Sequence, residues 1–200
     1  MYYNHSYLNL NDKNNNYNNE KLINNFLNNK KIERTVEDII KYDEINRKYA
    51  LFITKILNSI NKGTIINFKN NKNGYELENL SYKLAVICIK IKKANNFTPR
   101  PVQILAILRL ADSVFNSKGK GSIKEIKTGE GKSFIVSTLA IVLCQFNKKI
   151  DIVTSNIELA SRGKKEQEKN FELFNISSGV LYKEKEKEYL KGNKSYNLIF

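Results

Sequence analysis

Hydrophobic positions in residues 33–61 recur at three- and four-residue spacing, which is the period of an amphipathic helix. A loop over residues 62–76 follows, with Gly63 near its start, because glycine and polar residues interrupt the pattern there. A second helical pattern covers residues 76–93. We therefore expect residues 31–96 to form a helical appendage.

The pattern changes at residues 97–101 (FTPRP), which contain both prolines of the chain. Residues before proline avoid the helical region, so this is the clearest boundary in the sequence. Beyond it, predicted helices alternate with predicted strands. The helices cover residues 102–115, 132–146 and 157–174, and the strands cover residues 123–127, 150–154, 179–182 and 197–200. Repeating strand–helix units predict an α/β fold with a parallel sheet, whose ligand binds where the strands end.

The composition of the chain indicates a polar N-terminal tail and an excess of positive charge. Residues 1–30 are rich in Asn and poor in apolar groups, which favours a disordered tail. The net charge of +14 suggests nucleic acid or an acidic membrane as a partner. However, Lys and Arg outnumber Asp and Glu in both halves of the chain without forming a stripe. A general Lys and Asn bias is the simpler interpretation, so nucleic acid is the less favoured partner.

No stretch of the sequence is apolar over the roughly 20 residues that a membrane-spanning helix needs. The N-terminus also lacks the apolar core of a secretory signal. Cys88 and Cys144 lie in apolar helical runs and are interpreted as small core residues in a reducing compartment. These observations lead us to expect a cytoplasmic protein, at most peripheral to a membrane.

Candidate chemistry lies in residues 128–133 (TGEGKS), between the predicted strand at 123–127 and an apolar helix. Glycine lets backbone N–H groups approach a polyphosphate, and the helix N-terminus adds partial positive charge. Lys132 would contact the β- and γ-phosphates, and the Ser133 hydroxyl would bind Mg²⁺. The general pattern GxxxxGK[ST] requires glycine where this chain has Ile126. The loop therefore fits the variant TGxGK[ST], which helicase-like motors use.

Three motifs in this order are recognisable: VQ at residues 102–103, IKTGEGKS at 126–133, and VTSNIELASR at 153–162. They resemble the N-terminal ATPase domain of the SecA family, the preprotein translocase motor, which is related to DEAD-box helicases. Glutamate between the two loop glycines is typical of this family. The resemblance covers about residues 97–200, and residues 1–96 are similar only as a helical lead-in.

This resemblance implies a partial RecA-like P-loop domain with a parallel sheet, preceded by the helical region. It also implies ATP and Mg²⁺ as ligands, a polypeptide substrate, and a membrane translocation channel as partner. Gln103 would read adenine, as glutamine does elsewhere. The nucleotide-binding residues would be Gln103, Thr128, Gly129, Glu130, Gly131, Lys132, Ser133 and Arg162, with Lys132 also catalytic and Ser133 on the metal.

The family's second nucleotide motif, an Asp-Glu pair at the end of a later strand, does not follow Ser133 in this sequence. Asp43-Glu44 imitates it, but this pair precedes the loop and lies in a helical pattern, so we interpret it as a solvated helix face. The second motor domain is also absent. ATPase activity therefore stays open. The chain ends on an apolar strand pattern, which leads us to expect a piece of something larger.

Two other functions fit the loop. A fragment of a DEAD-like RNA or DNA helicase would share TGxGK[ST], but Glu130, the dispersed lysines and the lack of an aromatic platform disfavour it. A catalytically inactive nucleotide-binding interaction module would keep the fold without turnover.

Overall fold

The computed structural model describes residues 44–66, 68, 76–116, 121–181 and 198–200. By its internal contacts the chain divides into two compact units, Met1–Thr54 and Lys55–Phe200. In the first unit the described residues form the beginning of helix α3 (Glu44–Lys62), where Tyr49, Ala50 and Ile53 are buried. The predicted tail at residues 1–30 lies outside the described residues. The predicted three-part division of the chain stays a prediction.

The described residues before position 96 form two helices, as the hydrophobic spacing predicts. Helix α3 ends at Lys62, and helix α4 covers Leu77–Asn95. Glu44 is helical, whereas Asp43 and the start of the first predicted helix lie outside the described part. Helix α4 ends where Asn96 adopts a left-handed conformation (φ 52°), and its N–H donates to the carbonyl oxygen of Lys92 at 2.8 Å. Asparagine tolerates this conformation and is a common helix stop.

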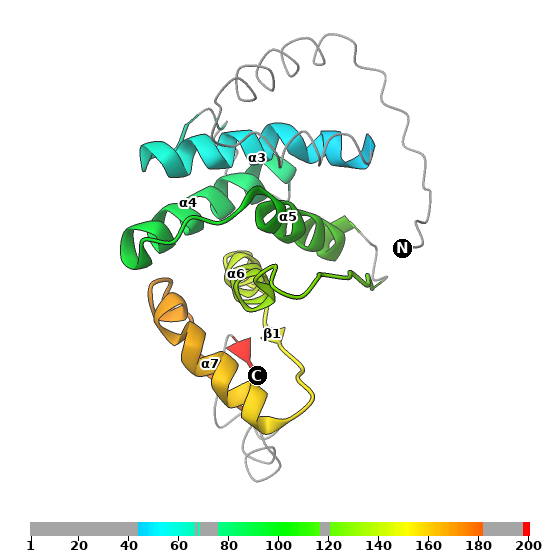
Figure 1. Cartoon of the computed structure of the whole chain (residues 1–200), viewed down its shortest axis with the longest axis vertical. Coiled ribbons are helices and arrows are strands. Elements are labelled where there is room, and N and C mark those ends of the chain that lie inside the picture. Colours follow the sequence, from blue (N-terminus) through cyan, green and yellow to red (C-terminus); the bar gives the residue numbers. More distant parts are fainter. Residues whose placement is uncertain (1–43, 67, 69–75, 117–120, 182–197) are drawn as a thin grey trace. The chain divides into compact units, whose positions relative to one another are not determined.

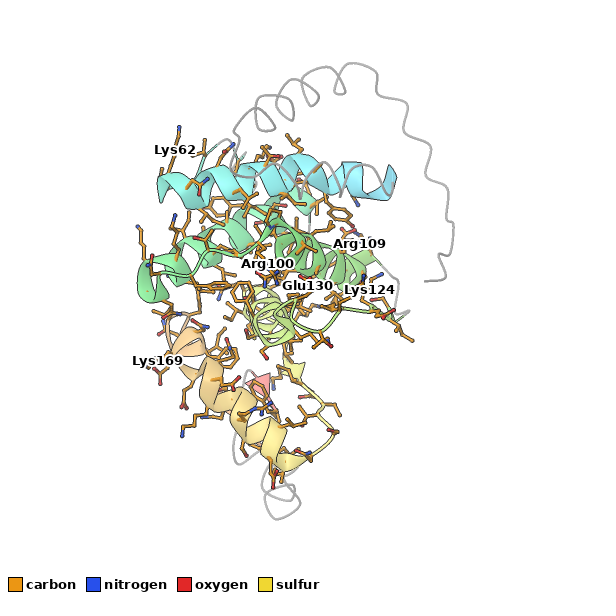
Figure 2. All side chains as sticks on the ribbon, in the orientation of Figure 1. Lys62, Arg100, Arg109, Lys124, Glu130 and Lys169 are labelled. Atoms are coloured by element: carbon orange, nitrogen blue, oxygen red, sulfur yellow. The ribbon has the colours of Figure 1, made fainter. Side chains whose placement is uncertain are left out.

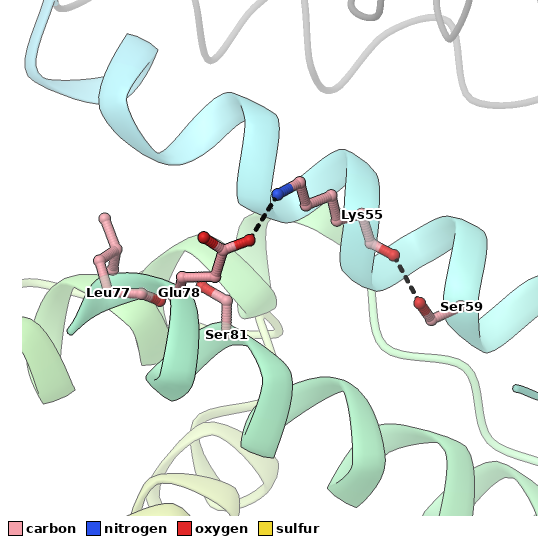
Figure 3. A network of polar contacts seen from close by, with 5 residues as sticks. All are labelled: Lys55, Ser59, Leu77, Glu78 and Ser81. Atoms are coloured by element: carbon pink, nitrogen blue, oxygen red, sulfur yellow. Dashed lines mark hydrogen bonds and ion pairs between the residues drawn. The ribbon is translucent and has the colours of Figure 1, made fainter. Parts of the chain in front are cut away.

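A small polar network joins the end of α3 to the start of α4 within the second unit (Figure 3). The Lys55 ammonium contacts the Glu78 carboxylate at 2.9 Å. Glu78 lies in the first turn of α4, where a negative charge complements the helix dipole. Ser59 and Ser81 each donate to a carbonyl oxygen of their own helix, those of Lys55 and Leu77, at 2.8 and 2.7 Å. The polar side chains in this region therefore have hydrogen-bond partners.

Helix α6 (Lys132–Cys144) lies at the centre of the second unit. It packs against α4 and α5 (Pro101–Asn116), and also against α7 (Ile157–Glu172) and strand β1 (Figure 1). A helix that is apolar almost all round is expected to be buried in this way. Helix α5 begins at the predicted proline. Helices α5, α6 and α7 each begin and end within about two residues of their predicted bounds. The buried side chains of α5 and α6 include Ile104, Ile107, Leu108, Ala111, Ile135, Ile141 and Val142.

The described part of the chain contains three strands of two residues each: β1 (Ile150–Asp151), β2 (Ser178–Gly179) and β3 (Leu198–Ile199). Strand β3 lies between the other two and pairs in parallel with both. Each coincides with part of a predicted strand or borders it, but all are shorter than predicted. The described residues are thus rich in helix and poor in strand. The extended parallel sheet of a RecA-like domain stays a prediction.

The prediction of a strand at residues 123–127 is wrong, because this segment is described and forms no strand. A strand exists through hydrogen bonds to a neighbouring strand, and the described strands pair as β1-β3-β2 without it. Ile123 is 99% exposed. Three of the five residues are charged, so the alternating pattern offers little apolar surface to bury.

Both cysteines are free thiols, as predicted. Cys88 is fully buried in α4, and this burial raises the pKa of its thiol to about 12. Cys144, at the end of α6, is partly exposed, and burial raises its pKa as well. None of the helices in the described part of the chain is both long and apolar enough to cross a bilayer.

Candidate nucleotide site

The loop before α6 is a turn built on two glycines. Gly129 and Gly131 both adopt left-handed backbone conformations, with φ of 84° and 77°. The N–H of Glu130 donates to the carbonyl oxygen of Lys127 at 3.3 Å, which closes the turn. Left-handed φ costs a residue with a Cβ about 1–2 kcal/mol, so the local backbone explains why glycine occurs at these two positions.

Gly131 immediately precedes α6, and Lys132 and Ser133 are the first two residues of the helix. Both side chains are exposed. The first turn of α6 contains no acidic residue, so nothing in it neutralises the partial positive charge of the helix N-terminus. The predicted arrangement of a glycine turn, a lysine and a hydroxyl at a helix start is therefore present.

Gln103 is buried in the first turn of α5 and contacts this loop. Its side-chain oxygen accepts from the backbone N–H of Arg100 at 2.9 Å, and its amide nitrogen donates to the carbonyl oxygen of Glu130 at 3.0 Å. A Cβ on Gly131 would lie 2.4 Å from the same amide nitrogen. Gln103 thus joins the start of α5 to the loop, in addition to the adenine-reading role expected from its motif.

Arg100 is the residue that the sequence reasoning missed. Its Nη2 lies 3.0 Å from a carboxylate oxygen of Glu130 and 3.3 Å from the carbonyl oxygen of Gly129. Both residues are labelled in Figure 2. Arg100 immediately precedes α5, and Glu130 lies in the loop before α6. The opposite charges of the two residues were visible in the sequence, but only the folded chain shows that they meet.

The third motif forms the start of α7. Asn156 caps this helix, because its side-chain oxygen accepts from the N–H of Leu159 at 2.8 Å. The Thr154 hydroxyl donates to the carbonyl oxygen of Asn156 at 2.9 Å. Arg162 is exposed on α7, and its Nε lies 3.6 Å from a carboxylate oxygen of Glu166, one turn along the helix. The role of Arg162 beside a nucleotide stays a prediction.

The segment leading into the loop carries positive charge. Lys124 lies in this segment, and Arg109 lies on α5 (Figure 2). Partial burial lowers the pKa of Lys124, and the charge of Arg109 lowers it further. Both effects lower the pKa because they disfavour the charged form of the lysine.

Comparison with known proteins places these motifs in a family. The model of the SecA DEAD-like domain family matches residues 9–198. The chain is also 32% identical over 95 residues to protein translocase subunit SecA 2 of Chlorobium chlorochromatii (strain CaD3), a match that covers 48% of this chain and 13% of the relative. It is 34% identical over 91 residues to protein translocase subunit SecA of Antithamnion sp., covering 46% of this chain and 10% of that relative.

The matched segment therefore spans about a tenth of the length of these curated relatives. Since the family match includes almost the whole chain, it extends the resemblance beyond residues 97–200 into the helical region before them. A DEAD-like domain is an ATPase-type domain and implies a RecA-like α/β fold. This match includes the glycine turn, Gln103 and the capped start of α7. The chain therefore belongs to the SecA DEAD-like domain family.

Proposed function

We propose that this chain binds ATP with Mg²⁺ through residues 128–133 and forms the nucleotide-binding segment of a SecA-like protein translocase motor. The observation that carries the proposal is the geometry of the loop. Two left-handed glycines lead directly into exposed Lys132 and Ser133 at the N-terminus of α6. Family membership supports the same reading.

The residues present fit a triphosphate. Backbone N–H groups at the start of α6 provide donors, and Lys132 provides a full positive charge. The Ser133 hydroxyl provides an oxygen of the kind that Mg²⁺ prefers. Thr128 precedes the first glycine, and Gln103 provides an amide for adenine. Bound ATP would supply the phosphoanhydride bond whose hydrolysis drives a motor.

The larger activity is also a proposal. Both curated relatives are translocase subunits by name, and we propose a polypeptide substrate and a membrane channel as partners of the complete motor. Hydrolysis would require an acidic pair to orient Mg²⁺ and water, which this chain does not contain after Ser133. The chain by itself is thus proposed to bind ATP.

Lys132→Ala tests the site. Removing one charge-assisted contact to phosphate should cost about 1.5–3 kcal/mol, which lowers affinity for Mg²⁺-ATP roughly ten- to a hundredfold. Isothermal titration calorimetry measures this directly. Lys165→Ala removes an exposed lysine of α7 and is the matched control, with affinity expected to stay at the wild-type value. Equal binding by the Lys132→Ala variant and the wild type would contradict the proposed site.

A further inference from the structure

Glu130 presents an electrostatic difficulty for the proposed site. It lies between the two glycines of the phosphate loop, and its side chain is 36% exposed. A carboxylate among groups that receive a triphosphate repels the ligand, since like charges at short range oppose each other. A loop that binds phosphate with this residue in place needs a compensating positive charge.

The structure places that charge at Arg100. Through Nη2 the guanidinium contacts both the Glu130 carboxylate and the carbonyl oxygen of Gly129. One group therefore offsets the negative charge of the loop and contacts its backbone. Arg100 is itself half exposed, so its field extends to the solvent side where a ligand would arrive.

Gln103 holds the backbones of Arg100 and Glu130 close together. Its buried amide accepts from the backbone N–H of Arg100 and donates to the backbone carbonyl of Glu130. The backbones of both charged residues are thus tied to the same side chain. The two long side chains start from positions that are already close, which reduces the entropy lost on pairing.

We propose that Arg100 is a positioning residue of the phosphate loop and the counter-charge of Glu130, so that the balance of this pair sets the affinity of the loop for phosphate. This role rests on the proposed function. It concerns the phosphates and not the base, and it therefore predicts the same effect on ATP and on inorganic tripolyphosphate.

The test is a charge cycle measured by calorimetry with Mg²⁺-ATP and with tripolyphosphate. Arg100→Ala should lower affinity for both by about two- to fivefold, the range for an exposed ion pair. Glu130→Gln should raise both by a similar factor, and the double variant should return close to wild type. Arg100→Lys keeps the charge and should retain most of the affinity. All of these differences should shrink as salt rises.

Lys164→Ala and Glu168→Gln are the controls, because they make the same kinds of charge change in an ion pair on α7. They should leave both affinities unchanged. An Arg100→Ala variant that binds like wild type would overturn the role of Arg100. So would a double variant or an Arg100→Lys variant as weak as Arg100→Ala, since Arg100 would then hold only the backbone.

Failure of the proposed function looks different. A wild-type chain that binds neither ligand overturns the nucleotide site and the role of Arg100 together. Binding that depends on Lys132 but is indifferent to the Arg100 and Glu130 variants leaves the site standing and removes only the counter-charge.

Discussion

Gly129 and Gly131 have the same left-handed backbone but different surroundings. A Cβ at position 129 would meet nothing within 4 Å, whereas a Cβ at position 131 would meet the amide of Gln103. The first glycine is therefore required only by its dihedral angles. The second is required by its dihedral angles and by the close approach of a buried side chain.

This pair allows a matched prediction. Gly129→Ala should lower the free energy of unfolding by about 1–2 kcal/mol through backbone strain alone. Gly131→Ala should cost about 1–3 kcal/mol more, because Gln103 must move and lose its hydrogen bond to Glu130. Urea denaturation followed by circular dichroism measures both. Equal losses for the two variants would mean that Gln103 yields to the new methyl group without consequence.

At this scale the sequence was a good guide to the loop and a poor one to its contacts. The turn at Gly129 and Gly131 and the helix that starts at Lys132 were predictable, because glycines before an apolar run indicate a turn that leads into a helix. The contact of Arg100 with Glu130 was not, since the two residues are thirty positions apart and no periodicity relates them. Gln103 was predicted from its motif, but its hydrogen bond to the loop was not.

Among the elements, α7 is stabilised by Asn156, the residue that caps its start. Only Ala160 and Phe171 of this helix are buried, so packing holds it less firmly than α5 or α6. The Asn156 cap satisfies one of the N–H groups that every helix start leaves without a partner. The helix start is thus stabilised locally.

Asn156→Ala should lower the free energy of unfolding by about 1 kcal/mol, the usual cost of losing an asparagine cap. Ser155→Ala changes the exposed neighbouring residue and should stay close to wild type. Thermal unfolding of the two variants in parallel provides the comparison. If both melted at the wild-type temperature, the cap would contribute nothing to stability.

Helices were predictable because their signal is local. The spacing of apolar residues within each segment specified α4 to α7 closely, and Pro101 marked the start of α5. Strands depend on neighbours that are distant in the chain. The pattern at residues 123–127 could not reveal that no described strand pairs with it, and the other strands were predicted longer than they are.

Across the second unit, burial of Cys88 makes stability depend on pH in the alkaline range. Its thiol has a pKa of about 12 in the folded chain, against 9.0 for the ordinary value. Well below pH 9 the thiol is protonated in both states and contributes no pH dependence. As pH rises from 9 towards 12, the unfolded chain loses this proton and the folded chain keeps it, so stability falls.

Comparison with Cys88→Ala isolates this effect. Between pH 9 and 11 the wild type should lose up to about 1.4 kcal/mol more per pH unit than the variant. The comparison uses the slope of the free energy of unfolding against pH, so the pH-independent effect of the substitution on stability cancels. Denaturant titrations at several pH values measure it. If the free energy of unfolding changed with pH in the same way for both proteins, the Cys88 thiol would have the same pKa in the folded and unfolded chains.

The engagement of Gln103 has a kinetic consequence for the proposed nucleotide site. Both polar atoms of its amide are already bonded, one to Arg100 and one to the loop. A glutamine amide has two N–H donors and two oxygen lone pairs, so each atom can make a further hydrogen bond. However, Gln103 is buried, so adenine can reach this amide only after the side chain moves. Phosphates can dock on the exposed loop at a rate set by diffusion, whereas the base must await this movement of the side chain. Capture of ATP would then proceed in two steps, the second independent of nucleotide concentration.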